Sequence, residues 1–259
     1  MKKLLYTGCL LLALLVSISK SFSQSTSWKG TVSINWNNAA NWTNGIPDNT
    51  KDVMLGDANF TGLFQPKVNI VTTCKSITIG GTVATTLTMT RGLTVTGNIS
   101  ISANGSFIHQ GATLYAAGNF TNNGAYSTTA TSSRIIFNGT NQTIGGASAT
   151  TFRVVVIYAS STISLNNNIT VTGASASLGV YGILDPGQSP SYTVTSTGLT
   201  RVYDQGKIKV NTADFTSNYV LTGTTTLYSG SIVDYSSTTV NQTISSSYSY
   251  STLMISGTG

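Results

Sequence analysis

A repeat with a period of 21 between Leu93 and Thr140 is the feature that most restricts how this chain can fold. Apolar and polar residues alternate within each unit, as in Leu93-Thr94-Val95-Thr96, and this period of two predicts β-strands rather than a helix. Three sets of residues recur at the spacing of 21: Leu93, Leu114 and Ile135; Val95, Ala116 and Phe137; and Gly97, Gly118 and Gly139. The first set predicts a single inward column of side chains, one from each unit.

A glycine closes each unit, and asparagine follows it at Asn98 and Asn119. Both residue types tolerate the positive φ values of sharp corners, so we expect them to turn the chain there. Short strands joined by corners at a fixed period are typical of a solenoid, in which each coil stacks on the preceding one. We therefore predict an all-β fold, a right-handed parallel β-helix. Tandem β-sandwich repeats of about a hundred residues are the alternative.

Residues 1–23 have the features of a secretory signal peptide. Met1-Lys2-Lys3 is basic, Leu4 to Ile18 is apolar, and Ser21-Phe22-Ser23 supplies small residues for the signal peptidase, which predicts cleavage before Gln24. Residues 24–60 then form a Trp-rich N-terminal cap segment, and residues 61–259 form the solenoid repeats. We expect a secreted protein, extracellular or at the outer-membrane surface, with no membrane insertion after cleavage.

All three tryptophans lie in the segment from Trp28 to Asp48. The first coil of a solenoid exposes its stacking surface unless another segment covers it, and large aromatic side chains can form that cap. The alternative is that Trp36 and Trp42 hold sugar rings against their faces. We favour the cap, because the polar partners that a sugar site needs are not evident beside these residues.

The repeat with a period of 21 residues becomes less regular after Ile144, and a second repeat with a longer period is also present. The block Asn141-Gln142-Thr143-Ile144 recurs as Asn241-Gln242-Thr243-Ile244, so we expect a module of about a hundred residues. The sequence ends at Gly259, directly after an apolar stretch that predicts a strand with an open edge. We therefore expect a fragment of a longer polypeptide, truncated at its C-terminus.

The segment from Trp28 to Asp48, with Asn41-Trp42 and Gly45-Ile46-Pro47, resembles the N-terminal region of large repeat-containing secreted surface proteins of Bacteroidetes. More distantly, it is similar to the passenger repeats of autotransporters. The two Asn-Gln-Thr-Ile blocks resemble repeats of the same surface proteins. The resemblance implies a parallel β-helix, export by a type IX-like secretion machinery and an adhesin-like role at the cell surface. The C-terminal sorting domain of that family is not found in this sequence.

Charge and composition argue against several functions. Outside the leader, which holds Lys2, Lys3 and Lys20, ten basic and seven acidic residues remain, without the basic clusters that nucleic-acid binding requires. All seven acidic residues are Asp and they are dispersed, whereas hydrolysis of polysaccharides requires paired carboxylates. We therefore predict no enzyme activity and no catalytic, cofactor-binding or metal-binding residues.

Three groups of residues were the strongest remaining candidates for chemistry. Asp48, Asp52 and Asp57, with Asn49 and Asn59, could bind calcium, but we favour turn residues that accept backbone hydrogen bonds. His109 is expected on a strand surface rather than in a metal site, because the chain has no second histidine. Cys74, the only cysteine outside the leader, is expected to be a buried small apolar residue rather than a nucleophile.

Threonine-x-threonine runs raise the question of a flat, stacked array of the kind that binds ice. A shift by one period of 21 places His109 beside Thr88 and Tyr115 beside Thr94, so the predicted array does not stack. We interpret these threonines as β-branched residues on a solvated strand face.

These features together predict a non-catalytic extracellular surface protein, a stalk or adhesin-like β-helix segment of a larger polypeptide. The alternatives are a carbohydrate-binding module and a polysaccharide lyase or hydrolase of the β-helix type. The expected partners are the secretion machinery and glycans or the surface of a host or neighbouring cell. No cofactor is expected.

Overall fold

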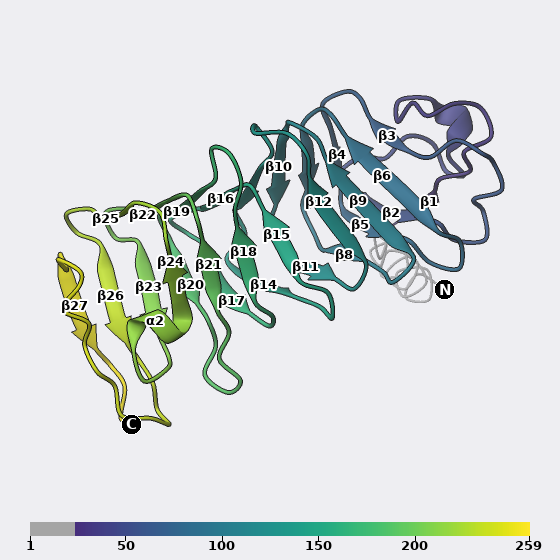
Figure 1. The fold of residues 1–259 in the computed structure, drawn as a ribbon. Coiled ribbons are helices and arrows are strands. Elements are labelled where there is room, and N and C mark those ends of the chain that lie inside the picture. Colours follow the sequence, from purple (N-terminus) through teal and green to yellow (C-terminus); the bar gives the residue numbers. More distant parts are fainter. Residues whose placement is uncertain (1–23) are drawn as a thin grey trace, which may run out of the picture.

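The computed structural model describes residues 24–259, which form one long stack of parallel coils (Figure 1). Helix is confined in this part of the chain to a 3-10 turn, η1 (Ala39–Asn41), and one helical turn, α2 (Phe215–Asn218). The predicted signal peptide, residues 1–23, lies outside the described residues. No helix of residues 24–259 combines the length and the apolar character needed to cross a membrane.

Each regular coil consists of three short strands separated by corners. The coil that starts with β7 (Leu93–Val95) continues through β8 (Ile99–Ile101) and β9 (Gly105–His109) before the chain returns beside β7 as β10 (Thr113–Ala116). Strands of the same rank in successive coils pair with one another, so the sheets run along the axis of the stack (Figure 1).

One sheet runs along the whole described chain and has eleven strands. In spatial order they are β1 (Gln24–Ser27), β2 (Lys51–Leu55), β5 (Ser76–Ile79), β8, β11 (Phe120–Asn122), β14 (Asn141–Gly145), β17 (Thr162–Leu165), β20 (Ile183–Asp185), β23 (Lys207–Val210), β26 (Ile232–Tyr235) and β27 (Thr252–Ile255).

The second sheet has eight strands, and its outer face carries the candidate site described below. Its strands are β4 (Thr72–Cys74), β7, β10, β13 (Arg134–Phe137), β16 (Val154–Ile157), β19 (Ser177–Val180), β22 (Leu199–Val202) and β25 (Thr225–Leu227). Two four-stranded sheets make up the third face. They contain β3 (Lys67–Val68), β6 (Thr85–Met89), β9 and β12 (Ala125–Thr128), and then β15 (Thr150–Phe152), β18 (Ile169–Val171), β21 (Val194–Ser196) and β24 (Tyr219–Leu221).

The strand pairing confirms the predicted parallel β-helix. Neighbouring strands of the eight-stranded sheet, such as β7, β10 and β13, run parallel and belong to consecutive coils. A β-sandwich would instead join antiparallel strands within two facing sheets. The alternative of tandem β-sandwich repeats is therefore wrong.

The predicted inward column is also confirmed. Leu114 pairs with Leu93 on one side and with Ile135 on the other, and all three side chains are buried. The alternation along each strand places Thr113 and Tyr115 on the opposite, outer face. The inward side of β7, β10 and β13 is thus a continuous stack of aliphatic and aromatic side chains.

The corner glycines serve a different purpose from the one predicted. Gly97, Gly118 and Gly139 do not have the positive φ expected of them, and neither do Asn98 and Asn119. A Cβ at Gly118 would overlap the backbone of Gly97 in the coil below, so glycine is needed there for close approach of two coils. The asparagines instead link the corners, because Asn98 Oδ1 accepts a hydrogen bond of 2.9 Å from the Asn119 backbone N–H.

The length of the coils changes along the stack. In the eight-stranded sheet, Leu93 pairs with Leu114, a step of 21, whereas Ile135 pairs with Val155, a step of 20, and Val155 with Leu178, a step of 23. The step is also 20 between β6 and β9, where Thr88 pairs with Ile108 rather than with His109 as predicted. The predicted pairing of Thr94 with Tyr115 is confirmed.

The recurrence of the Asn-Gln-Thr-Ile block at Gln142 and Gln242 reflects a shared structural role of the two glutamines rather than a repeated module. Gln142 accepts from the Gly139 N–H and donates to the carbonyls of Ala116 and Gly118. Gln242 makes the same pattern of bonds, accepting from Ser237 and donating to Val210 and Thr212. The preceding strands nevertheless differ, since β13 lies in the eight-stranded sheet and β26 in the eleven-stranded sheet, so the expected module is not repeated as a unit.

Candidate functional site

The tryptophan segment folds over the first coils as a buried aromatic cluster. Trp42 lies between Trp28 and Trp36, with ring centroids 5.0 and 4.8 Å away in edge-to-face geometry. The indole N–H of Trp42 donates to the Trp36 carbonyl over 2.8 Å, and that of Trp28 to the Phe64 carbonyl over 2.7 Å. All three side chains are almost completely buried and join the hydrophobic core. Their faces are therefore not available to a sugar ring, in agreement with the favoured capping role.

Asp48 and Asp57 act as turn residues, as predicted, whereas the interpretation of Asp52 as a turn residue is wrong, because it lies in strand β2. Asp48 accepts from the Thr50 backbone N–H at 2.9 Å, and Asp57 accepts from the Asn59 backbone N–H at 3.0 Å. Hydrogen bonds from Thr50 lower the pKa of Asp48 to about 2. Asp52 accepts from the Ser76 hydroxyl of the next coil. Within residues 24–259, these carboxylates do not gather into a group that could hold a metal ion.

Cys74 is buried in β4, as predicted, and its side chain is inaccessible to solvent. Burial, with a smaller effect of the Asp52 carboxylate, raises the pKa of the Cys74 thiol to about 12. Since the thiolate is the nucleophilic form, this environment suppresses its reactivity.

The prediction that His109 lies on a strand surface is wrong. In β9, Gly105, Phe107 and His109 all face inward, and only 1% of His109 is exposed. Its Nε2 lies 2.7 Å from the Ala112 carbonyl and its Nδ1 lies 2.8 Å from the Tyr126 hydroxyl. Because burial lowers the pKa of His109 to about 4, the ring is neutral, with Nε2 donating to the carbonyl and Nδ1 accepting from the tyrosine.

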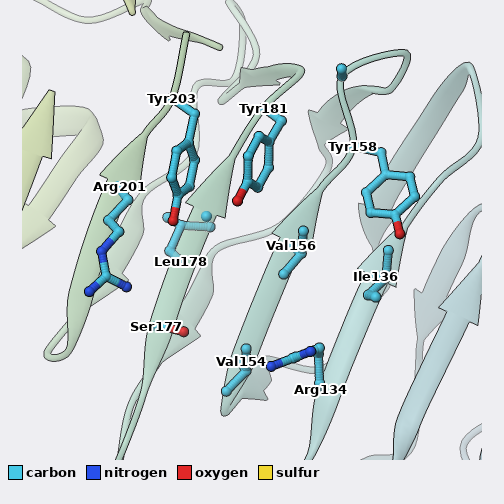
Figure 2. A pocket seen from close by; sticks show the side chains of 12 residues that line it. Arg134, Ile136, Val154, Val156, Tyr158, Ser177, Leu178, Tyr181, Arg201 and Tyr203 are labelled. Atoms are coloured by element: carbon cyan, nitrogen blue, oxygen red, sulfur yellow. The ribbon is translucent and has the colours of Figure 1, made fainter. Parts of the chain in front are cut away.

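The outer face of the eight-stranded sheet carries a depression that the sequence pattern does not predict (Figure 2). We call it the outer groove. It has a volume of about 560 Å³ and crosses β13, β16, β19 and β22. This size lies within the usual range of small-ligand sites. The residues that line it are Arg134, Ile136, Val154, Val156, Tyr158, Ala159, Ser177, Leu178, Gly179, Tyr181, Arg201 and Tyr203.

A ladder of tyrosines follows one edge of the outer groove. Tyr158, Tyr181, Tyr203 and Tyr228 each come directly after a strand of the eight-stranded sheet, one per coil. The rings of Tyr181 and Tyr203 are parallel, with centroids 3.9 Å apart, and Tyr228 continues the stack at 5.0 Å from Tyr203. Tyr158 stands apart from this stack (Figure 2). The face of Tyr181 that points away from Tyr203 is therefore not covered by another aromatic ring of the ladder.

The floor of the outer groove is apolar and is lowered at one position by a glycine. The outward positions of adjacent coils bring Ile136 beside Val156, Val156 beside Gly179, and Gly179 beside Arg201. Gly179 has no side chain to fill its outward position, and a Cβ there would lie 3.5 Å from the ring of Tyr203 and 3.8 Å from that of Tyr181. The two rings thus extend over the space that Gly179 leaves open.

Two arginines supply all the formal charge of the outer groove. Among residues 24–259, neither Arg134 nor Arg201 forms an ion pair or a side-chain hydrogen bond. The described lining residues include no carboxylate, imidazole or thiol. The groove can therefore bind through ring faces, phenol hydroxyls and guanidinium groups.

A sequence signal for the ladder existed but was hidden by the changing coil length. The pairs Ile157-Tyr158, Val180-Tyr181, Val202-Tyr203 and Leu227-Tyr228 each consist of an inward aliphatic residue and a tyrosine. Their successive spacings are 23, 22 and 25, so a search at the fixed period of 21 misses them.

The model of a family described as "Domain of unknown function (DUF8693)" matches residues 27–139, from β1 to just beyond β13. No curated protein and no solved structure matches the chain. Most of the outer groove, from Val154 to Tyr203, follows the matched region.

Proposed function

We propose that this chain is a non-catalytic segment of an extracellular surface protein, with a stalk-like or adhesin-like role. The observation that carries this proposal is the single sheet of eleven parallel strands that runs from β1 to β27. With adjacent strands about 4.8 Å apart, such a stack extends on the order of 50 Å. A β-helix of this kind holds its outer faces at a fixed distance from its base and presents them to partners.

The state of the ionisable side chains supports a role without catalysis. Asp48 and Asp57 hold turns, Asp185 binds Lys209 at 2.8 Å, and the only histidine and the only described cysteine are buried. Burial acts to raise the pKa of Asp185, but hydrogen bonds from Lys209, Gly187 and Asn211 outweigh it and keep this pKa below its usual value. These groups stabilise the coils rather than face an open groove.

The predicted leader supports export of this segment. The basic, apolar and small-residue regions of residues 1–23 follow the order of a signal peptide, and Gln24 begins the mature chain. The resemblance of the Trp28-to-Asp48 segment to secreted surface proteins of Bacteroidetes agrees with this location.

Localisation in the native cell tests the proposal. We expect the N-terminal sequence of the mature protein to start at Gln24 and protease added to intact cells to degrade the protein. A chain that retains Met1 and resists protease until the cells are lysed would refute an extracellular role. Incubation of the purified protein with neutral and acidic polysaccharides should release no new reducing or unsaturated ends, whereas steady release would favour the alternative of a glycan-cleaving enzyme.

A further inference from the structure

We infer that the outer groove is a binding site for acidic glycans, meaning chains whose sugars carry carboxylate or sulfate groups. The inference deepens the proposed function, because it gives the surface segment a ligand class, and it relies on that segment being exposed outside the cell. Three features of the groove carry it: two unpaired guanidinium groups, an aromatic ring with a free face, and an apolar floor opened by Gly179.

The arginines indicate an anionic ligand. Arg134 lies on β13, and Arg201 lies on β22, three coils further along the stack. The floor of the groove lies between them (Figure 2). A guanidinium group has donors in a planar fork that matches both oxygens of a carboxylate or a sulfate. Since the described part of the chain gives neither arginine an acidic partner, both remain free to bind a ligand.

The tyrosine ladder indicates that the ligand contains rings with an apolar face. A pyranose ring carries C–H groups on its faces, and these pack against the electron-rich face of an aromatic ring. The free face of Tyr181 points into the space between Tyr181 and Tyr158, and both residues line the groove (Figure 2). Tyrosine hydroxyls at the rim can also bond to sugar hydroxyls.

The architecture of the sheet disfavours the other polyanions. A peptide that binds as an added strand needs a free strand edge, but β16 and β19 are paired on both sides by neighbouring coils. A nucleic acid would require an extended row of cations along its phosphates, and only two arginines line the groove. A short acidic oligosaccharide requires neither of these features.

Titration calorimetry on the purified protein tests the inference. The probes are oligogalacturonate for carboxylate, a sulfated oligosaccharide of similar length for sulfate, and a cello-oligosaccharide as the neutral control. We expect binding to at least one anionic probe, weakened by added salt, and no measurable binding to the neutral one. Binding to a single anionic probe identifies carboxylate or sulfate as the recognised group.

Substitution of the arginines tests their role. Arg134→Gln and Arg201→Gln should each weaken binding of the anionic probe by about tenfold, in line with the loss of a charge-assisted hydrogen bond. Arg91→Gln removes an exposed arginine before β7, outside the groove lining, and should leave binding unchanged. Because neither groove arginine has a partner in the described chain, the circular dichroism melt of both variants should match that of the parent protein.

Filling the groove gives a test that does not change charge. In Gly179→Leu the new side chain occupies the hollow, and its Cβ meets the rings of Tyr203 and Tyr181 only at ordinary contact distances. We expect binding to fall at least tenfold while the fold is retained. Thr94→Leu makes a similar change on the same outward row, at β7, and should have no effect on binding.

Several outcomes would overturn the inference. They are the failure of both anionic probes to bind, equal binding of the neutral probe, and anionic binding that survives both the arginine and the Gly179 substitutions. A negative result here leaves the test of localisation untouched, so the two proposals fail separately. Preferential binding of a single-stranded oligonucleotide or an acidic peptide over both glycans would likewise reject it.

Discussion

At the scale of single residues, stability depends on which face of its strand a side chain occupies. Leu114 is fully buried in the inward column, so Leu114→Ala should cost about 2–5 kcal/mol of unfolding free energy and Leu114→Asp several kcal/mol, through a buried unpaired carboxylate. Thr113 faces outward and pairs with Arg134, so Thr113→Asp should change stability by no more than about 0.5 kcal/mol. Denaturant melts measure the difference, and equal losses at the two positions would refute this register.

His109 gives the protein a pH-dependent stability. Its pKa in the folded protein, about 4, lies below the ordinary value of 6.5, so between these pH values the unfolded chain binds the proton and the folded protein does not. Stability should therefore fall by roughly 3 kcal/mol as the pH drops from 7 to 4, through this residue alone. Chemical denaturation at several pH values measures the effect. In His109→Gln this part of the dependence should vanish, and an unchanged slope would contradict the assignment.

The position of His109 could have been derived from its own strand. Phe107 is a large apolar residue that must face inward, and the alternation of β9 puts His109 on the same side. The lack of a second histidine argues against a metal site, but it does not decide on which face of the strand His109 lies. A polar residue at an inward position is tolerated here because Tyr126 and the Ala112 carbonyl satisfy both ring nitrogens.

At the scale of the strands and corners, glycine is required where the backbones of two coils approach each other closely. Gly118→Ala should cost about 1–3 kcal/mol, because its Cβ would overlap the Gly97 backbone and force two coils apart. Gly92 is the matched control, since the nearest atom to a Cβ there is the Thr113 carbonyl oxygen at 3.7 Å. Gly92→Ala should be neutral or slightly stabilising. Thermal melts of the two variants make the comparison, and similar melting temperatures would exclude the close-approach explanation.

Gln142 links two corners through its amide group. Gln142→Ala would remove the partner of the Gly139 N–H and of the Gly118 carbonyl, and the loss should destabilise the protein by about 1–3 kcal/mol. Gln110 is exposed, so Gln110→Ala serves as a control with little expected effect. Denaturant melts should separate the two variants, and coincident curves would show that water replaces the Gln142 bonds at no cost.

At the scale of the whole molecule, the sequence predicted the fold class and the inward column between Leu93 and Ile135, because alternation and a constant spacing both survive there. It did not predict the outer groove. Ile136, Gly179 and Tyr181 come together only through strand pairing between coils, and the unequal coil lengths hide the recurrence of pairs such as Val180-Tyr181. The sequence also did not predict why the corners contain glycine. The reason is the close approach of the neighbouring coil, which the sequence of a single coil does not reveal.

The tryptophan cluster lies at one end of a stack in which each coil contacts mainly its neighbours, so damage there should spread inward from that end. Trp42→Ala should remove about 3–5 kcal/mol and accelerate amide hydrogen exchange in β2 and β5 more than in β17 and β20. Exchange measured by mass spectrometry on peptides from both regions tests this. A uniform acceleration along the chain would indicate that the described coils unfold as one cooperative unit.

The unequal steps between coils have a consequence for how such a chain can change. Leu93, Leu114, Ile135, Val155 and Leu178 stay in one inward row although the coils between them differ in length, so the corners absorb every difference. An insertion or deletion at a corner would therefore renumber all later coils without moving a single core side chain to the wrong face. Loops of new sequence can be gained along the edges of the molecule while the strands that precede the ladder tyrosines keep their alignment.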